Sequence, residues 1–305
     1  MGIFKHRILV YNLDQPENHI LSGSYFGRNI FVKGYSEQRL LPDPEDIVVM
    51  NLPFDIIQTA FIELPAVKNE KDMRRIVELE LKSIADINDE INVGYVKSIQ
   101  NKVLALYVKR SDYLQYKLSK NINFEPDVAY PNIFSELIIV KKLPGYWMYL
   151  VLGRMNSGVV VMNGDKIIGI RIIDFALEDI NKIVKEETGF GISEIERSDN
   201  EDLIEAARKI IDTLSPDIVG LLERELIISI NTTEIEKITI NQIAGLCLIC
   251  DLKVLKEAIL QLQWSFQKVT EAITILNIPQ RLTFADAGLL YRGGVELGKV
   301  KSIRW

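Results

Sequence analysis

Three apolar runs, separated by short glycine-bearing breaks, occupy residues 145–173 in the middle of the chain. Valine, isoleucine and aromatic residues fill most positions of these runs, which predicts β-strands at about 147–152, 157–162 and 166–173. The Asn163-Gly164 pair in the second break is typical of a tight hairpin, so we expect a meander of three antiparallel strands. Because the runs do not alternate between polar and apolar positions, we expect helices to cover both faces of this sheet.

The region before the meander predicts a first sheet followed by a small inserted unit. Apolar runs at 5–13, 28–35 and 46–51 indicate the strands of the first sheet. The inserted α+β subdomain, about 58–122, is expected to contain the following elements: a strand at 58–65, a helix at 70–85, a hairpin of strands at 91–99 and 102–109, and a helix at 111–120.

A helix at 127–140 is then expected to return to the first half, and residues 141–145 form a candidate hinge. The pattern therefore predicts two domains, 1–142 and 143–305. The elements expected after the meander are helices at 176–188, 200–214 and 215–230, a strand at 235–243, a helix at 251–263, a strand at 272–276, and a last helix at 283–292 that can return to the first half.

Composition places the chain among ordinary soluble proteins: 305 residues, 48% hydrophobic and 26% charged, can bury a substantial core. The net charge of -6 argues against nucleic acid as a partner, because binding to phosphates needs clustered cations. The short basic group of Lys299, Lys301 and Arg304 is interpreted as a solvated tail. No apolar run reaches the roughly 18 residues that a membrane-spanning helix requires.

Candidate chemistry is sparse. Cys247 and Cys250 have the C-x-x-C spacing, but apolar neighbours favour two buried thiols, and no second pair completes a zinc site. His6 and His19, the only histidines, are interpreted as surface or edge-strand residues. The many acidic residues on the predicted helices fit solvated faces. We therefore expect neither a metal site nor catalytic residues.

The segment from Val151 to Ser157 resembles the phosphate-binding hairpin of the actin, Hsp70 and sugar-kinase folds, where a glycine bend and a hydroxyl grip phosphate through backbone N–H groups. The resemblance implies nucleotide-binding roles for Gly153, Asn156 and Ser157. Val151 stands where that pattern has an aspartate. In the first half only Asp14 is a comparable acid, and its turn, residues 12–18, contains no glycine.

Gly245, in the pair Ala244-Gly245, is the remaining candidate for nucleotide contact, since related folds place a glycine pair after a strand next to the adenosine. A close turn from strand to helix explains it equally well.

The succession of motifs resembles the PilM and GspL cytoplasmic-domain family, the actin-like, FtsA-related scaffolds of type IV pili and type II secretion. Phe61-Ile62-Glu63-Leu64-Pro65 and the following acidic-apolar helix are similar to the start of the family's inserted subdomain. The segment from Phe284 to Arg292, with Ala287-Gly288-Leu289, is similar to its terminal helix. The resemblance implies an α/β, actin-like (ribonuclease-H-like) fold of two domains with mixed sheets and an inserted small α+β subdomain.

By the same resemblance we expect a non-enzymatic scaffold in the cytoplasm, peripheral to the inner membrane, with no required cofactor and a degenerate nucleotide site. The implied partners are the short tail of an inner-membrane protein of the PilN or GspM type and the assembly ATPase, and a homodimer stays open. The alternatives are a working ATP-binding protein or ATPase of the actin superfamily, with ATP and magnesium, and an FtsA-like polymer.

The expected mode of partner binding is an extended peptide that docks in a groove between the first sheet and the inserted subdomain. An exposed strand edge at 58–64 or at 102–109 would accept it by backbone pairing.

Overall fold

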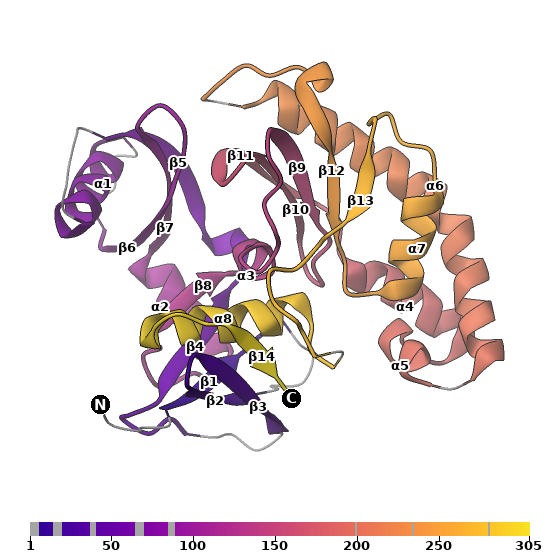
Figure 1. Ribbon diagram of the computed structural model, residues 1–305, viewed down its shortest axis with the longest axis horizontal. Coiled ribbons are helices and arrows are strands. Elements are labelled where there is room, and N and C mark those ends of the chain that lie inside the picture. The colour runs from indigo at the N-terminus through magenta and orange to yellow at the C-terminus, as the bar shows by residue number, and fades with distance from the viewer. Residues whose placement is uncertain are drawn as a thin grey trace.

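The computed structural model describes residues 6–14, 20–36, 41–64, 70–84, 89–198, 200–233, 235–279 and 281–305. Within these ranges two large sheets lie in separate halves, and a smaller sheet stands beside them (Figure 1). His19 falls outside the described residues. No helix in the described ranges is both long enough and apolar enough to cross a bilayer.

The first sheet has the strand order β14-β3-β2-β1-β4-β8. Its strands are β1 (His6–Tyr11), β2 (Ile20–Phe26), β3 (Asn29–Ser36), β4 (Ile47–Leu52), β8 (Val128–Pro131) and β14 (Ser302–Arg304). Three of them confirm the predicted runs, whereas β2 and β14 were not predicted. Since β1 lies between β2 and β4, the half-buried His6 is on an interior strand and not on an edge.

The second sheet has the order β11-β10-β9-β12-β13, and its first three strands confirm the predicted meander. They are β9 (Tyr146–Val151), β10 (Ser157–Asn163) and β11 (Lys166–Ile173), followed later in the chain by β12 (Ile243–Ile249) and β13 (Val269–Glu271). The hairpin between β10 and β11 closes through Gly164 and Asp165, and Gly164 has a φ of 60°, which glycine adopts without steric cost.

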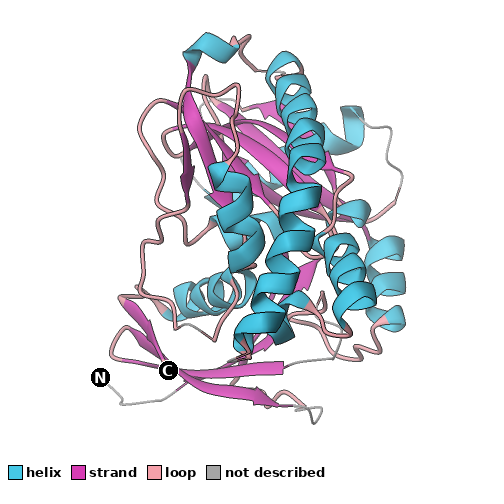
Figure 2. Ribbon diagram, turned by 90° about the vertical axis from the view of Figure 1, so that its right-hand side faces the viewer, coloured by secondary structure: helices cyan, strands magenta, loops and turns pink. Residues whose placement is uncertain are grey.

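Helices cover one face of the second sheet: α4 (Leu177–Thr188), α5 (Ile192–Arg197), α6 (Glu201–Asn231) and α7 (Lys253–Gln261). Figure 2 shows these helices in front of the sheet. The opposite face, with Trp147 and Tyr149, packs on the short helix α3 (Asn132–Leu137) and on Leu104 and Leu106 of the third sheet. The second sheet is interior, as predicted. We expected helices on both faces, but on this face the third sheet packs against it beside α3.

The inserted unit contains β5 (Gln58–Glu63), α1 (Glu70–Ile84), β6 (Ile91–Lys97), β7 (Lys102–Lys109) and α2 (Arg110–Ser119), which confirms every element predicted there. Its strand order is β5-β7-β6. The predicted edge at 102–109 is therefore wrong, because β7 pairs on both sides, while 58–63 does form an edge.

Several predicted boundaries are wrong. The segment 127–140 is not one helix, because β8 pairs with β4 before α3 begins. The two helices predicted at 200–214 and 215–230 form the single helix α6, with Pro216 inside it. The apolar stripe of Ile211, Val219 and Leu226 continues through the proline, so packing on the sheet outweighs the lost backbone hydrogen bond.

The strands predicted at 235–243 and 272–276 are also displaced. The side chain of Gln242 accepts a hydrogen bond from the Thr239 backbone N–H, at 2.8 Å, and this local turn precedes β12. Residues 273–275 instead form backbone hydrogen bonds with residues 139–141, which connect the two halves. The Lys141 N–H donates to the Ile273 carbonyl at 2.7 Å.

The last helix, α8 (Phe284–Leu297), lies on the first sheet and crosses α3. The crossing is close, because a Cβ built on Gly288 would be 1.6 Å from the Ser135 carbonyl oxygen. The two helices therefore meet backbone to backbone where the two halves join (Figure 1).

Candidate functional site

Two cavities flank the crossing of α3 and α8. The first, which we call the cleft, has a volume of about 530 Å³ and lies between the two halves. The second, which we call the groove, has a volume of about 780 Å³ and lies between the first sheet and the inserted subdomain.

Acidic side chains line one side of the cleft: Asp14 after β1, Glu136 on α3 and Asp251 after β12. Glu136 is buried, and its Oε2 has no hydrogen-bond partner among the described residues. Burial, followed by the charges of Asp251 and Asp14, raises the pKa of Glu136 well above its usual range. The environment of Glu136 therefore favours the uncharged form of its carboxyl group.

The other two acids are also shifted. Burial raises the pKa of Asp14 to about 6, although Lys120 and Arg154 oppose the shift and Asn132 donates a hydrogen bond to its carboxylate. Burial likewise raises the pKa of Asp251 to about 7, and this residue keeps an exposed surface. Three exposed cations of α4 and α5 also line the cleft: Lys182, Lys185 and Arg197.

The bend after β9 is tied to α4. The Gly153 carbonyl accepts from the Leu177 N–H at 3.1 Å, and Arg154 forms an ion pair with Glu178 at 2.9 Å. A Cβ on Gly153 would be 2.2 Å from the Asn156 carbonyl oxygen, so the bend requires glycine. Leu152 and Arg154 line the cleft next to this bend.

Other predicted nucleotide residues lie elsewhere. The Ser157 hydroxyl is fully buried without a hydrogen-bond partner among the described residues. Gly245 lies within β12, packed against the Trp147 ring and the Lys268 carbonyl, so its assignment to a position after a strand is wrong. Cys247 and Cys250 are buried, as predicted, and burial raises the pKa of Cys247 to about 11.

Val151 stands where the phosphate hairpin that the segment resembles has an aspartate. It is fully buried in the apolar core and leaves no carboxylate at its position. Among the described residues, no three Asp, Glu, His or Cys side chains are close enough to hold a metal ion.

Sequence reasoning missed Glu136, although a signal was available. It follows Ile133 by three residues and precedes Leu137, so at helical spacing it falls on the apolar side of the segment. A carboxylic acid on an apolar helix face is a common mark of a buried polar position.

The raised pKa of Glu136 predicts a pH-dependent stability. A carboxyl group whose pKa is higher in the folded state contributes stability below its unfolded pKa of about 4.3, and that contribution is lost as pH rises through the folded pKa. The Glu136→Gln variant should therefore be more stable than the unsubstituted protein at pH 7, and the difference should shrink towards pH 4.5. Urea midpoints measured between these pH values test it.

Glu186→Gln is the matched control, because it makes the same charge change on an exposed side of α4. A stability gain that is equal at both pH values, or equal in the control, would contradict the assignment.

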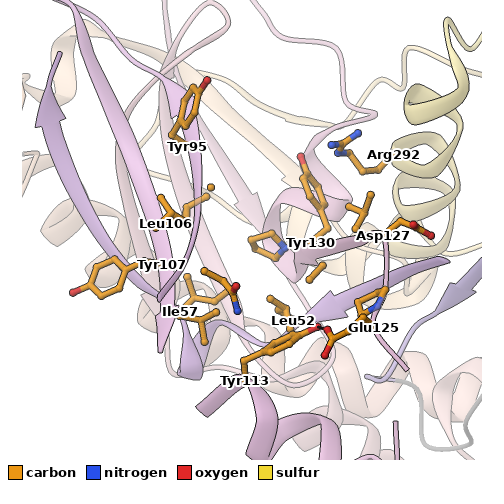
Figure 3. Close-up of a pocket in the computed structure, with 18 of the residues that line it drawn as sticks. Leu52, Ile57, Tyr95, Leu106, Tyr107, Tyr113, Glu125, Asp127, Tyr130 and Arg292 are labelled. Atoms are coloured by element: carbon orange, nitrogen blue, oxygen red, sulfur yellow. Dashed lines mark hydrogen bonds between the residues drawn. The ribbon is translucent and has the colours of Figure 1, made fainter. Parts of the chain in front are cut away.

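The groove is bordered by two edge strands (Figure 3). β8 ends the first sheet and β6 ends the third sheet, and residues of both strands line the cavity. Its apolar side chains include Leu52, Ile57 and Leu106. Exposed backbone edges over an apolar floor are the usual setting for an extended peptide.

Charged and aromatic residues surround the groove. Arg292 stacks on Tyr130, with its guanidinium 5.8 Å from the ring centre, and pairs with Glu296 at 2.5 Å. Glu125 accepts from the Tyr113 hydroxyl at 3.0 Å and from Lys117 at 2.7 Å. Both signs of charge are present, and their partners hold these side chains in place.

Comparisons with known proteins agree with this architecture. No protein-family model matches the chain, and no curated protein matches it. Among solved structures, a PilM-PilN type IV pilus biogenesis complex is similar with a TM-score of 0.59 at 13% identity, over 96% of this chain and 99% of that chain.

Two further similar structures are more distant. The cytoplasmic domain of EpsL, an inner-membrane component of the type II secretion system of Vibrio cholerae, gives a TM-score of 0.31 at 12% identity, over 56% of this chain and 71% of that one. A Bacteroides thetaiotaomicron protein with an actin-like ATPase fold gives 0.33 at 12% identity, over 61% and 78% respectively. The actin-like fold expected from the sequence is confirmed, and at these identities the likeness shows the fold alone.

Proposed function

We propose that this protein is a docking scaffold of a type IV pilus or type II secretion assembly platform. In this proposal it works at the cytoplasmic face of the inner membrane without catalysing a reaction. The groove would bind an extended cytoplasmic tail of an inner-membrane partner of the PilN or GspM type, and another surface would meet the assembly ATPase. The observation that carries the proposal is the pair of edge strands, β8 and β6, that border one groove.

The likeness to a PilM-PilN complex supports this choice of partner class, because that structure covers nearly the whole chain. An extended tail would form backbone hydrogen bonds with β8 or β6 and place alternate side chains on the apolar floor. The polar residues at the border of the groove, among them Arg292 and Glu125, would then fix the register of the peptide.

Gly94 provides a direct test of groove binding. It lies on β6 within the groove, and a Cβ built on it has no atom within 4 Å, so a larger side chain fits the fold but occupies the space of a peptide. We expect Gly94→Leu to weaken binding of a synthetic peptide of the PilN-type tail from the same organism at least about tenfold, or 1.4 kcal/mol. Fluorescence anisotropy of the labelled peptide measures this.

Gly220→Leu is the matched control, because Gly220 on α6 also has open space around its Cβ position. The control should bind the peptide like the unsubstituted protein. If both variants bind equally well, the peptide does not occupy the groove, and if the unsubstituted protein does not bind the tail, the proposed partner class is wrong.

The second candidate is an ATP-binding protein of the actin superfamily. The observation in its favour is the set of cations Lys182, Lys185 and Arg197, which line the same cleft as Arg154 of the Gly153 bend. The Gly153 bend would then contact phosphate, without the buried Ser157 hydroxyl. Calorimetry with magnesium and ATP separates the two candidates: the scaffold without nucleotide predicts a Kd weaker than about 100 μM, or about 5.5 kcal/mol of binding free energy.

A further inference from the structure

Exposed aromatic and basic side chains gather at the outer edge of the first sheet, away from both cavities. They come from the β2-β3 hairpin and from β14, which pairs parallel to β3. We call this group the rim patch, defined by Phe26, Arg28, Phe31, Lys301, Arg304 and Trp305.

The members of the rim patch are neighbours in the sheet. Arg304 is the register partner of Phe31, and its guanidinium lies 6.0 Å from the centre of that ring. The Lys301 N–H donates to the Arg28 carbonyl at 2.7 Å, which joins the two strands at the hairpin end. The patch is therefore continuous along one edge of the fold, next to the C-terminal end marked in Figure 1.

The aromatic side chains of the patch are unusually open to solvent. Phe26 is 46% exposed, Phe31 is 36% exposed and Trp305 is 52% exposed. Exposed aromatic residues in a group mark an interaction surface more often than singly scattered ones do.

The charge of the patch is opposite to that of the whole chain. Arg28, Lys301 and Arg304 are exposed, Lys33 and Lys299 flank them, and within the described residues none of these five makes an ion pair. In the turn before β4 of the same sheet, Asp43 and Asp46 form ion pairs with Arg7. The chain as a whole carries a net charge of -6.

We infer that the rim patch binds the surface of an anionic lipid bilayer directly. Aromatic rings insert at the level of the headgroups, while Lys and Arg beside them meet lipid phosphates. The cations and the aromatic rings lie side by side along a sheet edge and do not line a groove. A fluid layer of lipid headgroups can adapt to a surface of this kind. This surface is separate from the groove, so the inference does not depend on peptide docking.

The net negative charge of the chain does not prevent this contact. At physiological salt the Debye length is about 8 Å, so charges on the far side of the molecule are screened while the patch is not. Each Lys or Arg close to an anionic membrane contributes about 1 kcal/mol, which is a factor of about five in partitioning. The charge distribution therefore favours one orientation, with the edge of β3 and β14 on the membrane.

Tryptophan fluorescence provides the test, because the three tryptophans differ in exposure. Trp147 and Trp264 are 6% and 9% exposed, so a change on contact with vesicles reports on Trp305. We expect a blue shift and a rise in emission with vesicles of equal phosphatidylcholine and phosphatidylglycerol at about 0.1 M salt, and no change with vesicles of phosphatidylcholine alone. Vesicle sedimentation measures the partition coefficient in parallel.

Two variants of the full chain identify the surface. Lys301→Glu with Arg304→Glu should lower the partition coefficient by at least about 25-fold, because two cations at about 1 kcal/mol each are lost and two anions are added. Arg28→Glu with Lys33→Glu should do the same on the hairpin side, without altering β14. The control is Lys209→Glu with Lys253→Glu, whose side chains are both 74% exposed on α6 and α7, and which should bind like the unsubstituted protein.

The outcomes are distinct. Binding that depends on the anionic lipid, falls in both patch variants and is unchanged in the control supports the inference. Absence of binding, equal binding to neutral vesicles, or equal loss in the control overturns it. Retention on heparin or an acidic peptide without vesicle binding would assign the patch to another polyanion and also overturns it.

Discussion

Replacing Gly288 with alanine is expected to lower the free energy of unfolding by about 3 kcal/mol, because overpacking at a fixed backbone forces the neighbouring helix to move. The added Cβ would lie 1.6 Å from the Ser135 carbonyl oxygen and 3.2 Å from the Ile138 side chain. Backbone cannot yield as a side-chain tip can, so α3 and α8 must separate. The shift of the urea midpoint, followed by circular dichroism, measures this loss.

The control for this substitution is Gly220→Ala on α6. Its Cβ position is open, and alanine is favoured over glycine in an exposed helix by about 1 kcal/mol. We therefore expect the same chemical change to stabilise the protein at residue 220 and to destabilise it at residue 288. Equal midpoints for the two variants would show that the helix crossing is looser than the structure indicates.

Asp286→Ala is expected to cost about 3 kcal/mol or more, since buried donors that lose a charged acceptor keep their desolvation penalty. Asp286 is 1% exposed. Its carboxylate accepts from the Asn12 side chain at 2.8 Å and from the Tyr35 hydroxyl at 2.6 Å. This hydrogen-bond network thus links the end of β1 and strand β3 to the start of α8. The decrease of the thermal unfolding midpoint measures how much the network contributes to stability.

Asp286→Asn separates the loss of charge from the loss of the acceptor. The amide keeps one oxygen of the same shape, so we expect roughly half the destabilisation of the alanine variant. If the alanine variant unfolds at the same temperature as the unsubstituted protein, the network does not hold α8 on the sheet.

The sequence predicted the meander well because local and tertiary preferences agree there. β9, β10 and β11 are rich in β-branched and aromatic residues, and β9 and β10 are buried on both faces. The inserted subdomain was also predictable, since α1 and the β6-β7 hairpin each show their period within a few residues. Where one pairing partner follows the other directly, pattern reasoning is sufficient.

The remaining elements depend on contacts that pattern reasoning does not see. Pro216 ends a helix by propensity, yet the stripe from Ile211 to Leu226 packs on the second sheet and keeps α6 continuous. β8 becomes a strand only because β4, distant in sequence, pairs with it. The strand order that makes β6 an edge is likewise set by pairing across the hairpin and β5.

The candidate site shows the same division. The Gly153 bend was predicted from its spacing. The pKa of Glu136, in contrast, is raised only when the two halves of the fold bury its carboxyl group. The groove could be anticipated between the first sheet and the inserted subdomain. Its two borders could not, since each border is a strand that the topology places at the end of its sheet, with one neighbour only.

Helix α8 has a mechanical consequence for the two cavities. Thr283, its cap, and Ala285 line the cleft, while Arg292 and Glu296 line the groove. Its 14 residues form a rod about 20 Å long that touches α3 at Gly288. If this helix tilted as one body, a wall of each cavity would move with it, so a ligand that widens the groove would also change the shape of the cleft.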